Sequence, residues 1–126
     1  MRKGWERGKE VREEAAMTFD EYQRAALRTT NPALDQRGRL MDAAAGLAEE
    51  AGEILGLIRK REYQGREVAR DRLVEELGDA LWCVAITADA LGIPLEELAR
   101  ANVAKLQRRH PLGFSSGNPG AARSDL

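Results

Sequence analysis

The sequence predicts an all-α protein, a bundle of about four main helices. Three observations support this fold class. Apolar residues recur at spacings of three and four in four separate segments, turn-forming residues stand between those segments, and no segment alternates as a strand would. The low aromatic content, 5%, and the high charged content, 33%, suit a helical protein. A chain of 126 residues is long enough for one compact domain with a real core.

The first helix is expected over Phe19–Leu27. Thr18 and Glu21 have the spacing of a capping box, in which each side chain caps the other residue's backbone N–H. A Thr-Thr-Asn-Pro run then ends the helix. Residues 1–16 are strongly charged and weakly patterned, so they are expected to form a leader, either a frayed helix or disordered chain. The domain is therefore expected to begin at residue 17.

The second helix is expected from about Arg39 to Arg61. Its apolar positions form one helical stripe: Leu40, Ala44, Leu47, Ala51, Ile54 and Ile58. At about 100° per residue, Glu50 falls at the edge of this stripe, and Glu53 lies one step further round. Glu49 points further away than either. The motif Glu-Glu-x-x-Glu thus lies at the margin of the buried face.

The third helix is expected over about Asp71 to Leu91, after a polar loop, with Gly92 as its C-terminal cap. Its main seam contains Leu73, Leu77, Ala80, Leu81, Val84, Ala88 and Leu91. Further apolar residues occupy its other sides, which predicts that the helix is buried nearly all round. Glu76 and Asp79 lie on this apolar helix, where carboxylates need a partner.

The fourth helix is expected to begin near Pro94 and to end near Arg109, before Pro111. Leu95, Leu98 and Leu106 mark its inner face, and the polar residues Asn102, Lys105 and Arg109 extend the same side. Polar residues on an inward stripe break the helical pattern, and such breaks are typical of functional sites. Residues 115–126, rich in Gly, Ser and Ala, are expected to form a disordered tail, so the domain spans 17–114.

Two acidic motifs point to a metal site. Carboxylates at i and i+3 project from one side of a helix, as in Glu50 and Glu53 and again in Glu76 and Asp79. A lone motif of this kind usually faces solvent, but the second pair lies on the most apolar helix of the chain. An antiparallel hairpin would bring both pairs to similar heights. Oxygen ligands favour hard divalent cations such as Mg²⁺, and nearby Lys and Arg side chains suggest phosphate chemistry. The chain has no Gly-rich phosphate loop, so helix side chains must build the site.

Composition and charge exclude several other functions. The net charge of −1 gives no basic field for nucleic acid. Cys83 is the single cysteine, which excludes an internal disulfide and fits a reducing cytoplasm. No apolar run approaches the ~20 residues of a membrane span, and the N-terminus lacks the apolar region of a secretory signal. The sequence therefore predicts a cytoplasmic protein without a membrane partner.

Between Thr18 and Phe114 the sequence resembles the MazG-like all-α nucleoside triphosphate pyrophosphohydrolases. The matching stretches are Asp-Glu-Tyr-Gln at 20–23, Gly-Leu-Ala-Glu-Glu-Ala-Gly-Glu at 46–53, Glu-Leu-Gly-Asp-Ala-Leu-Trp at 76–82 and Asn-Val-Ala-Lys-Leu at 102–106. The resemblance implies Mg²⁺-dependent cleavage of a nucleoside triphosphate, for example a deoxynucleotide, to the monophosphate and pyrophosphate. It also implies that Mn²⁺ can substitute for Mg²⁺, and that the chain assembles as a homodimer or homotetramer.

The resemblance assigns roles to individual residues. The Mg²⁺ ligands would be Glu50, Glu53, Glu76 and Asp79. Glu49 would position or deprotonate the attacking water, or bind a further metal. Contacts to phosphate or sugar would come from Lys60, Asn102, Lys105 and Arg109, with Lys105 also supporting charge at the scissile phosphate. Trp82 either stacks on the base or packs in the core, and Lys105 could instead form a structural salt bridge to the carboxylates.

Three positions depart from the family pattern: Gln64 stands where many relatives carry His, Cys83 where Tyr is common, and His110 replaces an aromatic residue. Other functions remain open. The substrate could be dUTP or phosphoribosyl-ATP, or the chain could be a non-catalytic helical interaction module. A di-iron carboxylate bundle is disfavoured, because it needs two Glu-x-x-His motifs and the chain has one His.

Overall fold

The computed structural model describes residues 16–114, which form four helices and no strand. In chain order the helices are α1 (Phe19–Leu27), α2 (Gln36–Tyr63), α3 (Arg70–Ala90) and α4 (Leu95–Arg109). The all-α prediction with four main helices is confirmed. Residues 1–15 of the predicted leader and all of the predicted tail, 115–126, lie outside the described residues.

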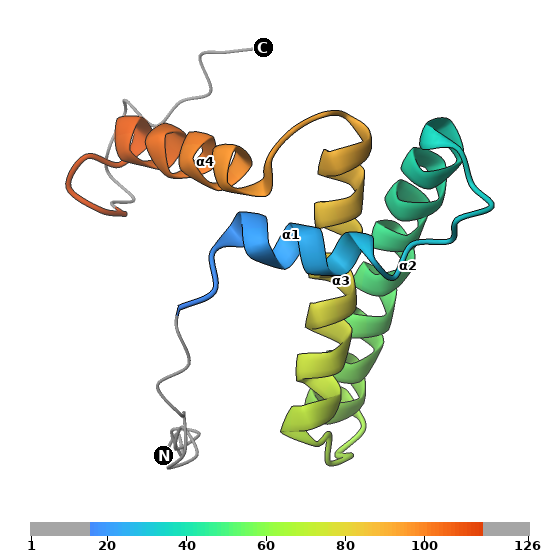
Figure 1. Ribbon diagram of the computed structural model, residues 1–126. Coiled ribbons are helices and arrows are strands. Elements are labelled where there is room, and N and C mark those ends of the chain that lie inside the picture. The colour runs from blue at the N-terminus through green and yellow to red at the C-terminus, as the bar shows by residue number, and fades with distance from the viewer. Residues whose placement is uncertain (1–15, 115–126) are drawn as a thin grey trace.

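The arrangement is an antiparallel hairpin with two helices attached near one end (Figure 1). α2 and α3 pack along their length, α1 crosses α3, and α4 packs on α1 and on the end of α3. Between α3 and α4 the chain bends by 104°. The hairpin loop between α2 and α3 therefore lies far from α4, at the opposite end of α3 (Figure 1).

Helix ends follow local capping chemistry. The capping box at α1 is present: Thr18 Oγ1 accepts a hydrogen bond from Glu21 N at 3.1 Å, and Glu21 Oε2 accepts one from Thr18 N at 3.3 Å. α2 begins three residues before its expected start because Asp35 is its N-cap and accepts from Gly38 N at 2.7 Å. The sequence prediction placed the start of the helix at the beginning of the apolar stripe. The polar residues before that stripe form the first turn of α2.

The buried core lies at the end of the hairpin where all four helices meet. Its members are mostly small, and partly buried larger side chains surround them: Ala26, Ala43, Ala85, Ile86 and Leu95, with Tyr22, Leu27, Trp82 and Val84 around them. Small residues let the helices approach closely. At Gly46 on α2, an added Cβ would lie 3.1 Å from Cys83 Sγ on α3. This close contact fixes how α2 and α3 face each other.

One buried side chain closes the corner between α3 and α4. The Gln23 amide on α1 donates to Ala85 O and to Ile93 O, both at 3.1 Å, and its Oε1 accepts from Leu95 N at 3.0 Å. Asp20, also on α1, accepts from Glu96 N at 3.0 Å. α1 thus supplies the cap that Pro94 lacks, because Pro94 makes no side-chain hydrogen bond to the first turn of α4.

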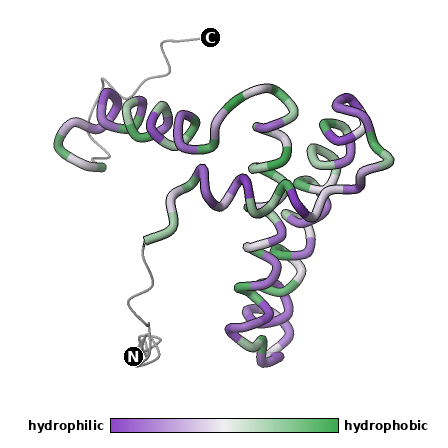
Figure 2. Tube along the Cα trace, viewed as in Figure 1, coloured by the Kyte–Doolittle hydropathy of each residue, from purple (hydrophilic) through white to green (hydrophobic). Residues whose placement is uncertain are grey.

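Two expectations about burial are wrong for this single chain. Apolar residues occur along the length of α3 (Figure 2). The helix is not buried all round, however, because Val74 and Leu77 in its first half are 50% and 56% exposed. α4 does not turn its polar stripe inward either, since Asn102 and Lys105 are exposed and Leu106 is exposed beside them. Both errors have one cause. Helical periodicity shows which residues share a face, but not whether another helix of the same chain covers that face.

Among residues 16–114 no single helix is long and apolar enough to cross a membrane. α3 and α4 reach that length and composition only when taken together, across the bend of 104°.

Candidate metal centre

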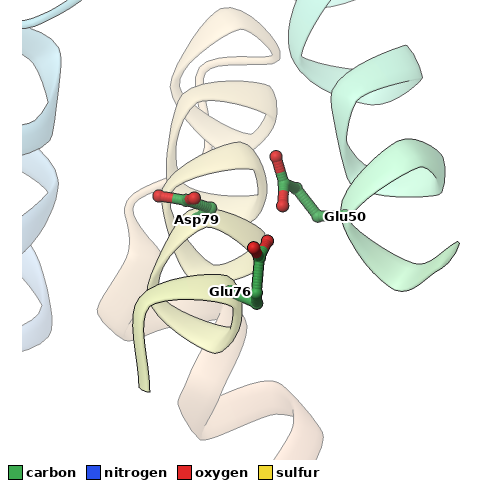
Figure 3. A group of neighbouring side chains, drawn as sticks. All are labelled: Glu50, Glu76 and Asp79. Atoms are coloured by element: carbon green, nitrogen blue, oxygen red, sulfur yellow. The ribbon is translucent and has the colours of Figure 1, made fainter. Parts of the chain in front are cut away.

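Three carboxylates meet where α2 faces the first half of α3. Glu50 projects from α2, and Glu76 and Asp79 project from α3 (Figure 3). One oxygen from each of them lies within 4.8 Å of the others. The i, i+3 spacing puts Glu76 and Asp79 on one side of α3, and the antiparallel pairing of the hairpin brings Glu50 to the same height. The predicted meeting of the two motifs is therefore present.

Glu76 is the buried member of the group, with only 6% of its surface exposed. A buried carboxylate needs a cation or hydrogen-bond donors, because loss of water disfavours its charge. Among the described residues, its ion-pair partner is Arg72, one turn earlier on α3, whose Nη2 lies 2.9 Å from Glu76 Oε1. Arg72 also lies 3.6 Å from Glu75 on the helix surface.

Glu50 is electrostatically frustrated. Its Oε2 is buried and has no hydrogen-bond partner within residues 16–114. The pKa of Glu50 lies above its usual value, first because of a side-chain hydrogen bond with Glu76, which requires a proton between the two carboxyls. Burial and the charges of Asp79, Glu76 and Glu49 raise the pKa further. The carboxylates of this group therefore repel one another.

These residues fit a hard divalent cation. All three donors are carboxylate oxygens, the ligands that Mg²⁺ and Mn²⁺ prefer, and Glu50 Oε2 is buried without a hydrogen-bond partner among the described residues. Among the three residues there is neither a thiolate nor an imidazole to favour zinc. A cation there would remove the repulsion that raises the pKa of Glu50.

The remaining predicted acidic residues lie at the edge of this group. Glu53, expected as a fourth ligand, is exposed and lies outside the set of three. Glu49 is also exposed, yet its charge contributes to the raised pKa of Glu50, so it lies close enough to act on the site. The roles of both residues stay predictions.

The predicted phosphate contacts do not reach the carboxylates within this chain. Lys60 is exposed near the end of α2, and Asn102, Lys105 and Arg109 lie on α4. Within residues 16–114 no hydrogen bond or ion pair links any of them to Glu50, Glu76 or Asp79. The alternative of an intrachain salt bridge between Lys105 and this group is thus not realised in the described chain.

The aromatic and titratable residues singled out in the sequence have structural partners. Trp82 borders the core and donates its indole N–H to Thr29 Oγ1 at 2.7 Å, which joins α3 to the end of α1. Cys83 is buried, and burial followed by the charge of Glu50 raises its thiol pKa. His110 is the C-cap residue of α4, and its ring lies 5.9 Å from that of Phe114.

Sequence reasoning missed two residues that border the site. Arg72 pairs with Glu76, and its position four residues before a predicted ligand was a usable signal. Tyr22 on α1 lies near the site from another helix: burial, then the charges of Asp79 and Cys83, raise the pKa of its hydroxyl. No spacing rule within α1 could have found Tyr22, because its proximity depends on how α1 crosses α3.

The fold and these residues define a helical domain with an oxygen-only cation site between two antiparallel helices. Residues 41–114 match the MazG nucleotide pyrophosphohydrolase domain. This stretch contains all three carboxylates and Arg72, and it makes up more than half of the chain. The chain therefore belongs to the MazG nucleotide pyrophosphohydrolase family.

The chain is also similar to two curated proteins. The Gene 37 protein of Mycobacterium phage L5 is 39% identical over 77 residues, which cover 58% of this chain and 68% of the phage protein. The uncharacterized protein YvdC of Bacillus subtilis (strain 168) is 35% identical over 72 residues, which cover 50% of this chain and 68% of YvdC. No solved structure matches the chain significantly.

Proposed function

We propose that this protein is a Mg²⁺-dependent nucleoside triphosphate pyrophosphohydrolase that removes nucleotides from the cytoplasmic pool. One observation supports the proposal most strongly. In a chain of the MazG family, two helices bring three carboxylate oxygens within 4.8 Å of one another, and Glu50 Oε2 is buried without a hydrogen-bond partner among the described residues. Such a set is suited to hold a cation that in turn holds phosphate.

Glu50, Glu76 and Asp79 would hold the cation, and Glu53 is the proposed fourth ligand. When bound, Mg²⁺ supplies positive charge to phosphate oxygens and lowers the pKa of a coordinated water. Glu49, exposed beside Glu50, would accept a proton from the attacking water. Water oxygen then bonds to the α-phosphorus, the bond between that phosphorus and the bridging oxygen breaks, and pyrophosphate leaves.

We further propose that a second copy of the chain completes the protein. Val74, Leu77 and Leu81 are exposed at spacings of three and four on α3 and form one apolar row. Leu81, at one end of this row, lines a pocket of about 230 Å³ together with Met17 and Phe19. An exposed apolar row suits a two-fold contact between identical chains, in which the same residues of both copies meet. In such an assembly, the polar residues of α4 in one copy would face the carboxylate group of the other copy.

A substrate panel tests the proposed reaction. Wild-type protein is incubated with each common dNTP and NTP, dUTP and phosphoribosyl-ATP, with Mg²⁺ or with a chelator, and the products are separated. The expected result is monophosphate plus pyrophosphate, only when metal is present. Diphosphate plus phosphate would contradict the proposed bond cleavage, and no turnover of any substrate would favour a non-catalytic helical module.

A further inference from the structure

The Arg72 guanidinium lies against one of the three carboxylates of the candidate metal centre. Its Nη2 lies 2.9 Å from Glu76 Oε1, so it neutralises the most buried of the three carboxylates. The Arg72 side chain is 54% exposed, whereas that of Glu76 is 8% exposed. Arg72 therefore borders solvent, where it also lies 3.6 Å from Glu75, whereas Glu76 is enclosed in the site.

The same helix position puts Arg72 on the loop side of the carboxylates. It lies one turn before Glu76, about 6 Å along the axis of α3. The loop end of the hairpin, residues 59–72, is rich in positive charge. Its cations are Arg59, Lys60, Arg61, Arg66, Arg70 and Arg72, against the anions Glu62, Glu67 and Asp71. A phosphate chain that starts at the carboxylate site therefore meets positive charge if it extends toward this loop.

We propose that Arg72 is a substrate-phosphate ligand that changes partner: it pairs with Glu76 in the empty site and donates to a phosphate oxygen of the metal-bound nucleotide. The proposal rests on the proposed function. A guanidinium matches phosphate geometry with two parallel N–H groups, and the contact is stronger than an ion pair open to solvent. Arg72 thus neutralises Glu76 in the empty site and favours metal that arrives together with a polyanion.

A purely structural role for Arg72 makes the opposite prediction for metal alone. If Arg72 only orients Glu76, its loss should weaken metal binding. If it competes with metal, its loss should tighten metal binding, by up to about fivefold, since a partly exposed ion pair is worth at most about 1 kcal/mol. The sign of this change separates the two roles without any catalytic assay.

The experiment compares Arg72→Gln and Arg72→Lys with wild type in two calorimetric titrations. The first uses Mn²⁺ alone. The second uses a non-hydrolysable α,β-imido nucleoside triphosphate at saturating Mn²⁺. Arg100→Gln is the matched control, because Arg100 makes a solvent-exposed ion pair with Glu96 at the same four-residue spacing and at 3.0 Å. Circular dichroism checks that each variant keeps its helices.

For Arg72→Gln we expect tighter Mn²⁺ binding and about tenfold weaker binding of the nucleotide analogue, as the loss of one charge-assisted contact implies. Arg72→Lys should fall between wild type and Arg72→Gln, and Arg100→Gln should match wild type. Weaker Mn²⁺ binding, or unchanged nucleotide binding, in Arg72→Gln would overturn the proposal. If wild type hydrolyses nucleotides while Arg72→Gln keeps its KM, only the role of Arg72 is wrong. If wild type neither binds nor hydrolyses them, the proposed function fails as well.

Discussion

The two halves of α3 differ in both sequence and surroundings: residues 70–80 include six charged residues, whereas residues 81–90 include one. In the second half, Ala85, Ile86, Ala88 and Ala90 are each at most 3% exposed, because α1, α2 and α4 enclose them. In the first half, Val74 and Leu77 are half exposed, and only α2 lies alongside (Figure 1). The second half of α3 has no buried polar residue, whereas the first half contains the buried carboxylate of Glu76.

The two halves of α3 therefore have different roles, one in stability and the other in the chemistry of the candidate site. The second half provides apolar packing, so substitutions there should act on folding. The first half provides the carboxylates and an uncovered apolar row, so substitutions there should act on metal, substrate and assembly.

The largest effect is expected for Glu76→Gln. The change keeps the volume of the side chain but removes a charged ligand, so hydrolysis should fall by about a thousandfold or more while helicity is retained. Asp89→Asn is the control, since Asp89 is a partly buried carboxylate in the second half of the same helix. Steady-state rates at several Mg²⁺ concentrations measure both. Comparable loss of activity in Asp89→Asn would remove the distinction between the halves.

Ile86→Ala should instead lower stability. Ile86 is 1% exposed in the core, so the deletion leaves a cavity and should cost about 2–5 kcal/mol of unfolding free energy. Leu77→Ala removes a similar volume in the first half, where the chain by itself leaves the side chain exposed. Urea unfolding at two protein concentrations measures both variants.

For Leu77→Ala the loss should depend on protein concentration, because the proposed second copy covers this residue. A large loss that is the same at every concentration would show that Leu77 is buried within its own chain. A negligible loss at every concentration would argue against an assembly through this row.

Metal should stabilise the folded protein by a smaller amount. A cation that binds only the folded state raises its stability by about 2.7 kcal/mol at one hundred times its Kd. We expect Mg²⁺ or Mn²⁺ to raise the thermal midpoint, and excess chelator to reverse the rise. Glu50→Gln should lose most of it. An unchanged midpoint in wild type with either ion would contradict a preformed site.

The smallest effect concerns pH in the absence of metal. The pKa of Glu50 is raised above 4.5 in the folded protein, mainly by its hydrogen bond with Glu76. The folded state therefore keeps a proton that the unfolded state has lost. This contribution to stability is complete below pH 4.5 and disappears as pH rises through the folded pKa.

Melting curves with chelator, from pH 4.5 toward neutrality, should show this decline in wild type and a flatter profile in Glu50→Gln. Added metal should weaken the decline, since metal binds the deprotonated carboxylates. Identical pH profiles for wild type and Glu50→Gln would show that Glu50 is not the group responsible.

Much of the fold could be predicted from local signals. The capping box set α1 within its true bounds, and Gly92, with a φ of 73°, ends α3 where the pattern stopped. The meeting of Glu50 with Glu76 and Asp79 followed from spacing and an antiparallel hairpin. The direction of α4 could not be predicted, because it depends on hydrogen bonds between residues about 70 positions apart.

The same limit applies to the candidate site. The ligand types and their helix faces are properties of short segments, so the sequence could show them. Which cations approach them is a property of tertiary and quaternary structure. The pairing of Arg72 with Glu76 could have been predicted from their four-residue spacing. The positions of Tyr22 and of the α4 residues relative to the site depend on how the helices cross, which the sequence of a short segment does not determine.

The Gln23 amide has a consequence for the smallest piece of this chain that can stand alone. The family match begins at residue 41, within α2, and so omits α1. A fragment trimmed to that match would keep every carboxylate of the site. It would also leave Ala85 O, Ile93 O and Leu95 N without the one side chain that satisfies all three. We therefore expect a fragment that folds on its own to begin before Gln23, and thus to be longer than the stretch that matches the family.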